Sequence, residues 1–126
     1  MAMSPYWDEC WANPSNRENR FGLKASAAVS MAREQLADCL GIKPERIIFT
    51  SGATEANNLA LLGHARAMAA SLGQPGHLIT VKTEHQAVLD PLRQLQYEGY
   101  KLTEIQPNSD GTLSLEKLTQ AFQDNT

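Results

Sequence analysis

The sequence predicts an α/β protein whose sheet is mainly parallel and is flanked by helices. Two observations support this prediction. Short segments rich in β-branched and aromatic residues alternate with longer segments in which apolar residues recur every three or four positions. Turns that contain glycine or proline separate the two kinds of segment. Strands that alternate with helices of this length need crossover connections, and such connections place neighbouring strands parallel.

The first expected elements follow from local patterns. Residues 1–22 lack a period and contain Pro5 and Pro14, so we expect an irregular N-terminal loop, with the alternating helices and strands in residues 23–126. An apolar stripe from Leu23 to Leu40 predicts a helix that stops at Gly41. The brief segment Arg46–Thr50 is β-branched and aromatic, which predicts a buried strand.

The remaining elements repeat this alternation. We expect a helix rich in alanine and leucine from Thr54 to Leu72, a strand over His77–Lys82, a helix from Pro91 to Gly99, a strand over Lys101–Ile105 and a helix after Ser114. Asp90 as N-cap and Pro91 at the first helical position favour a start at Pro91. Ser114 is the expected cap of the last helix.

The composition excludes several classes of protein. The chain has 126 residues, of which 42% are hydrophobic, enough for one domain with a modest core. The chain has 11 Lys and Arg against 14 Asp and Glu and contains no run of basic residues, so no nucleic-acid surface is predicted. No stretch approaches the roughly 20 apolar residues of a membrane span, and the first residues lack a signal-peptide pattern. Cys10 and Cys39 lie far apart, which favours reduced thiols in a cytoplasmic protein, and no spacing of ligand-type residues predicts a metal site.

The loops after the strands are the places to search for a site, because open parallel sheets bind ligands beyond the carboxyl ends of their strands. After the first strand, Ser51 and Gly52 lead directly into a helix that begins near Thr54. A helix N-terminus offers unpaired N–H groups to a phosphate, and the Thr54 hydroxyl could add a donor. The alternative is that Ser51 or Thr54 simply caps the helix.

A histidine follows the second strand. His85 is expected at the same edge of the sheet as the Gly52 turn, where an imidazole could stack on a planar ring or move protons near neutral pH. The alternative is a surface or capping histidine. Lys82 is the only lysine expected near this edge.

Two long motifs carry a resemblance to a known family. The segments IIFTSGATEANNLA (residues 47–60) and KTEHQAVLDPL (residues 82–92) resemble the cysteine desulfurases of the NifS/IscS branch, within the class-V aminotransferases. The likeness runs from about Tyr6 to Thr126, with both motifs at matching separation.

The resemblance implies a fold, a cofactor and a reaction. Residues 1–126 would form the N-terminal portion of the large domain of a fold-type I enzyme that binds pyridoxal phosphate. Ala53 and Thr54 match the turn that holds the cofactor phosphate, and His85 matches the histidine that stacks on the ring and assists proton transfer. Family members are homodimers that take sulfur from L-cysteine, giving L-alanine and an enzyme persulfide, and they pass the sulfur toward iron–sulfur clusters and other thio-cofactors through acceptor scaffold proteins.

The sequence also departs from the family pattern. The family's N-terminal strand, its aspartate and glutamine at the ring, its Schiff-base lysine and its mobile-loop cysteine have no match in the 126 residues. The chain is therefore expected to be an N-terminal fragment that is inactive alone and that self-associates through open sheet edges. The alternatives are a non-catalytic module that pairs with a full desulfurase or a complementary chain, and a small domain that binds a nucleotide or phosphate.

Overall fold

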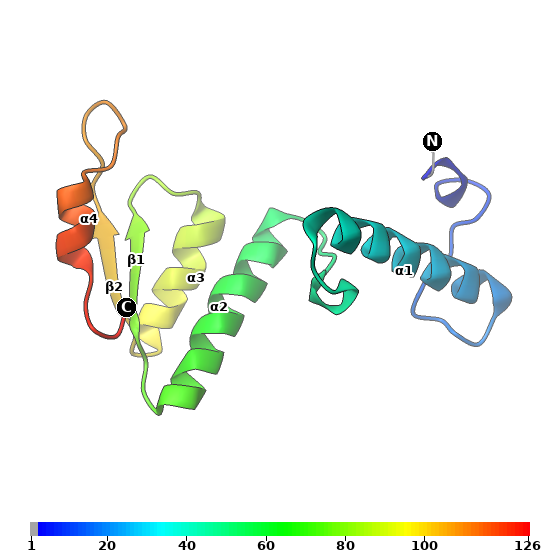
Figure 1. The fold of residues 1–126 in the computed structure, drawn as a ribbon, viewed down its shortest axis with the longest axis horizontal. Coiled ribbons are helices and arrows are strands. Elements are labelled where there is room, and N and C mark those ends of the chain that lie inside the picture. Colours follow the sequence, from blue (N-terminus) through cyan, green and yellow to red (C-terminus); the bar gives the residue numbers. More distant parts are fainter. Residues whose placement is uncertain (1–2) are drawn as a thin grey trace. The chain divides into compact units, whose positions relative to one another are not determined.

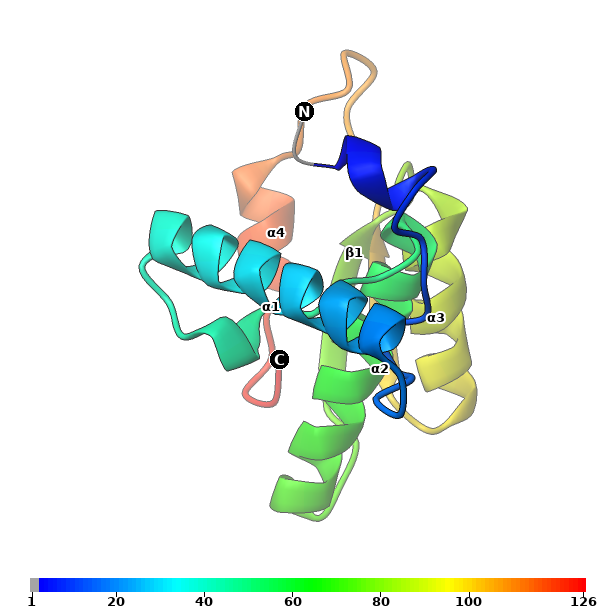
Figure 2. The same cartoon turned by 90° about the vertical axis from the view of Figure 1, so that its right-hand side faces the viewer.

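A computed structural model describes residues 3–126 (Figures 1 and 2). The chain divides into two compact units, one ending at Phe49 and the other spanning Thr50–Thr126. Its elements are η1 (Ser4–Tyr6), α1 (Arg20–Leu40), η2 (Pro44–Arg46), α2 (Ala53–Leu72), β1 (His77–Val81), α3 (Gln86–Tyr97), β2 (Lys101–Ile105) and α4 (Leu115–Ala121). The α/β class with parallel strands and flanking helices is confirmed.

The first unit is built on α1. This helix begins at Arg20, inside the segment expected to be irregular, because the Asn19 side chain caps it by accepting a hydrogen bond of 2.8 Å from the Gly22 amide. It ends at Gly41, whose φ of 65° is the left-handed conformation expected of a terminating glycine. At Gly22 the preceding loop passes so close that an added Cβ would lie 1.7 Å from the Asn16 carbonyl oxygen, so only glycine fits there.

The apolar stripe of α1 is largely open to solvent. Val29, Leu36 and Leu40 are exposed, whereas the buried positions of the helix are Gly22, Ala25 and Ala37. Within its unit the helix packs against the short η2 turn. The helix predicted by the apolar period is therefore confirmed, but the period alone does not show whether another segment covers the stripe.

The prediction of a strand over Arg46–Thr50 is wrong. Residues 47–50 have no assigned regular structure, and Arg46 belongs to η2. A strand needs a neighbouring backbone to receive its hydrogen bonds, and the part of the chain that the structure describes offers none to this segment. Phe49 is held instead by a cation–π contact, with the Arg33 guanidinium 5.0 Å from its ring centroid.

The second unit is a two-stranded parallel sheet with helices on both sides (Figure 1). β1 and β2 pair in the register His77↔Lys101 to Val81↔Ile105. Helix α3 connects them and contacts β2 and α2, while α4 contacts β2 from the other side (Figure 1). The strand predicted over His77–Lys82 ends at Val81, one residue early, and the strand Lys101–Ile105 is confirmed.

The core of this unit lies between α2, α3 and the sheet. Ala65, Leu92, Leu95 and Tyr100 are buried there, with Leu95 fully enclosed. The Tyr100 hydroxyl donates a 2.8 Å hydrogen bond to the Ala65 carbonyl, which satisfies the buried phenol. This packing fixes the angle between α2 and α3 and so positions the ends of both helices.

Helix α3 does not begin at Pro91. It begins at Gln86 with His85 as N-cap, and Pro91 lies inside the helix. A proline in that place lacks the N–H that would bond the Ala87 carbonyl, yet its ring is buried. Asp90 is consequently a helical residue and not a cap. The expected cap Ser114 is confirmed, because its side chain accepts from the Lys117 amide that follows the start of α4.

Candidate functional site

The N-terminus of α2 presents open amide donors. Gly52 is the N-cap, and it has no side chain to accept from the first turn. The amides of Ala53 and Thr54 precede the first intrahelical bond and so remain available to an acceptor. Neither Ser51 nor Thr54 caps the helix with its side chain, which removes the simple capping alternative.

The bend before α2 is fixed by a glutamate. The Glu55 Oε2 atom accepts from the Ser51 amide at 2.6 Å and from the Ser51 hydroxyl at 2.7 Å. These two bonds, the amide bond first, hold the pKa of the Glu55 carboxyl below its usual range. The carboxylate is therefore ionised and turned back onto the bend at neutral pH.

His85 caps the facing helix. It follows the turn after β1 in an extended conformation, and its Nδ1 atom accepts from the Ala87 amide at 3.0 Å. Because Nδ1 is the acceptor, the proton of the neutral ring belongs on Nε2. The side chain is exposed, so the Nε2 edge of the ring can face a ligand.

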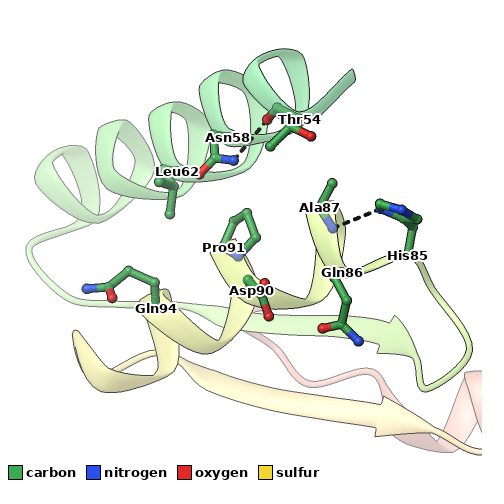
Figure 3. Close-up of a pocket in the computed structure, with 9 residues that line it drawn as sticks. All are labelled: Thr54, Asn58, Leu62, His85, Gln86, Ala87, Asp90, Pro91 and Gln94. Atoms are coloured by element: carbon green, nitrogen blue, oxygen red, sulfur yellow. Dashed lines mark hydrogen bonds between the residues drawn. The ribbon is translucent and has the colours of Figure 1, made fainter. Parts of the chain in front are cut away.

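Thr54 and His85 line one pocket, as Figure 3 shows. The pocket has a volume of about 470 Å³ and is lined by residues of α2 and α3 and by His85, the N-cap of α3. Its lining residues are Thr54, Asn58, Leu62, His85, Gln86, Ala87, Asp90, Pro91 and Gln94. The structure thus brings together two of the three expected site residues, while Ala53 adjoins Thr54 without lining the pocket.

The sequence did not predict three amide side chains that line the pocket, namely Asn58, Gln86 and Gln94. Thr54, Asn58 and Leu62 recur every four residues on α2, and Gln86, Asp90 and Gln94 do so on α3. Residues four apart share a face of a helix. The three residues of α2 therefore lie on one face, as do the three of α3, and both faces line the pocket. That spacing is the signal that could have found them. The Asn58 amide also donates to the Thr54 carbonyl at 2.9 Å, which ties this face to the helix start.

Three further observations concern the described residues. Lys82 is exposed and does not line the pocket. Within residues 3–126, no three His, Cys, Asp or Glu side chains gather closely enough to hold a metal ion. Helices of that same stretch are all too short or too polar to cross a bilayer.

The class of protein follows from this fold and from comparison with known families. Residues 1–126 match the class-V aminotransferase family, and the chain belongs to it. Within that family it is similar to cysteine desulfurases of the NifS/IscS kind. The IscS cysteine desulfurase of Aeromonas salmonicida is 49% identical over 119 residues, which cover 94% of this chain, and that of Proteus mirabilis is 48% identical over the same share.

Solved structures agree with the sequence relatives. A NifS-like protein superposes with a TM-score of 0.81 at 32% identity, covering 99% of this chain and 33% of that one. SspA in complex with cysteine gives 0.77 at 38% identity, over 99% and 35% of the two chains. The chain spans about 29% of the length of the curated relatives it matches.

Proposed function

We propose that this chain forms the N-terminal part of the pyridoxal phosphate domain of a cysteine desulfurase. The observation that carries the proposal is the common pocket of Thr54 and His85, at the starts of two helices that the core holds side by side. The similarity to IscS proteins and to the cysteine complex of SspA supports L-cysteine as the substrate.

The residues present fit the cofactor. A phosphate monoester carries several acceptor oxygens, and the start of α2 offers it the amides of Ala53 and Thr54 together with the Thr54 hydroxyl. An added Cβ at Gly52 would meet nothing within 4 Å, so the space beside these donors is open. Ala53 and Thr54 would hold the phosphate, and the imidazole of His85 would lie against the pyridine ring.

Each part of the chain then has a defined task. Bound pyridoxal phosphate supplies an electron sink for bond breaking at the amino acid substrate. Thr54 and the α2 terminus anchor and orient the group. His85, fixed at Nδ1 by the Ala87 amide, keeps Nε2 free to hold or pass a proton.

The parent activity needs groups that the 126 residues lack, namely the lysine that binds the cofactor and the cysteine that accepts the sulfur. We infer that this chain does not release sulfur by itself. For the whole protein we propose a cytoplasmic homodimer that delivers sulfur from its persulfide to an acceptor scaffold for iron–sulfur cluster assembly.

Binding of pyridoxine 5′-phosphate tests the proposal, because this analogue lacks the aldehyde and cannot react with surface lysines. In an NMR titration the amides of Ala53 and Thr54 should shift with the phosphorylated analogue and much less with pyridoxine. Thr54→Ala should weaken binding about tenfold through loss of one hydroxyl bond to a charged group, and Thr54→Ser should retain most of it. Preference for a nucleotide such as AMP would contradict the cofactor assignment. Sulfide release from L-cysteine by the chain with pyridoxal phosphate would contradict its inactivity alone.

A further inference from the structure

We propose that Glu55 is a positioning residue that shapes the anion site at the start of α2 without touching the anion. Its carboxylate ties down the bend at Ser51 and so keeps the Ala53 and Thr54 amides open and aligned. The identity of the anion as the cofactor phosphate rests on the proposed function above.

The hydrogen-bond pattern supports this role. Glu55 is the third residue of α2, the position from which a glutamate usually reaches back to the amide of the N-cap. Here it reaches one residue further, to Ser51, and accepts from both the amide and the hydroxyl. The N-cap itself is Gly52, which has no side chain to bond the first turn.

The bend has little else to hold it. The other side-chain bond to it runs from the Thr50 hydroxyl to the Gly52 carbonyl and is long, at 3.3 Å. Without Glu55 the Ser51 hydroxyl would be released, and a serine next to a helix start can turn to accept from first-turn amides. That new bond would compete with an incoming anion for the same donors.

The charge of Glu55 makes the inference testable. A carboxylate at a helix N-terminus repels a bound phosphate, so an effect through charge alone predicts that any neutral replacement strengthens binding. An effect through geometry predicts instead that the glutamine variant binds the anion more tightly than the alanine variant. The glutamine oxygen, in the place of Oε2, can still accept from both the Ser51 amide and the Ser51 hydroxyl, whereas alanine can accept from neither.

The experiment titrates wild type, Glu55→Gln and Glu55→Ala with pyridoxine 5′-phosphate and with pyridoxine, followed by amide NMR shifts. We expect Glu55→Ala to bind the phosphorylated probe about tenfold more weakly and Glu55→Gln to stay within about threefold of wild type. Hydrogen exchange of the Ser51 amide should accelerate in the alanine variant alone. Glu116→Ala is the matched control, because Glu116 is also an exposed glutamate in the first turn of a helix, α4.

The outcomes separate this inference from the proposed function. If wild type binds and Glu55→Ala binds equally well or more tightly, the positioning role is overturned and the proposed function stands. If wild type shows no preference for the phosphorylated probe, the proposed function fails and the role of Glu55 fails with it. A loss in Glu116→Ala that equals the loss in Glu55→Ala would overturn the role as well, since the effect would then not depend on the bend.

Discussion

His85 combines two roles in one side chain. Its Nδ1 atom caps α3, and the rest of the ring lies at the pocket that Thr54 also lines. His85 is therefore a capping residue, as one of the two interpretations expected, and the cap leaves the ring available for a functional role. Histidine is not among the residues that usually cap helices, which is why the sequence pattern favoured Asp90 and placed the helix start too late.

Two substitutions separate these roles of His85. Asparagine can accept from the Ala87 amide, so His85→Asn should leave the free energy of unfolding nearly unchanged, whereas His85→Ala should lower it by about 1 kcal/mol through loss of the cap. Both variants should lose ring stacking and weaken the binding of pyridoxine 5′-phosphate. Chemical denaturation and the NMR titration measure the two effects. Equal stability of the two variants would show that the cap contributes nothing.

At the scale of elements, α2 and the end of α3 are joined by an ion pair. The Arg66 guanidinium donates to both carboxylate oxygens of Glu98, with 2.9 Å from Nε to Oε2. The Gln94 side chain of α3 also donates a hydrogen bond to the Glu98 carboxylate. These bonds, the Arg66 bond first, lower the pKa of Glu98 to about 2. The pair sits beyond the buried Ala65–Tyr100 contact and reinforces the same packing of α2 against α3.

The acid stability of the protein should report this ion pair. Because the folded-state pKa of Glu98 lies below its ordinary value of 4.5, the pair stabilises the fold fully above about pH 4.5, and that contribution is lost as pH falls toward 2. Glu98→Gln should flatten the curve of unfolding midpoint against pH between 5 and 2, and Arg66→Gln should flatten it similarly. The change is modest because both side chains are partly exposed. Curves parallel to that of wild type would contradict the assignment.

The whole molecule leaves sheet edges without a neighbour in the described residues. Lys82 donates its amide to Ile105 of the β2 strand, and His77 donates to Asn125 on the other side. Since backbone groups alternate along a strand, the amides of Ile79 and Val81 also point away from β2. Apart from the bond from the His77 amide to the Asn125 carbonyl and the turn bond from the Glu84 amide to the Val81 carbonyl, that edge is open to another strand within the described residues.

We therefore expect the 126-residue chain to self-associate as its concentration rises. Ile79→Pro removes an amide from the open edge without removing a β1–β2 bond, so it should weaken association while circular dichroism stays the same. Sedimentation velocity over a range of concentrations measures the effect. A monodisperse monomer at every concentration would contradict this expectation.

Local chemistry allowed much of the fold to be predicted from the sequence. Gly41 and Gly73 end α1 and α2 because they adopt the left-handed conformation at the point where the apolar period stops. β1 and β2 pair in parallel because a helix separates them in the chain. The expectation that Thr54 and His85 lie at one site is met, because both line the same pocket. Only His85 follows a strand, however, since the strand expected before Thr54 is absent from the described residues.

Tertiary structure decided what depends on a partner. The segment 47–50 has strand-like residues but no neighbouring backbone to bond, and the apolar stripe of α1 is regular yet largely exposed. The start of α3 depends on the hydrogen bond that the His85 imidazole accepts from the Ala87 amide, and the spacing of apolar residues does not predict that bond. The pocket itself arises because the packing of α2 on α3 brings two separate helix starts together. Propensity and periodicity act within a segment, whereas pairing, burial and the gathering of a site are decided between segments.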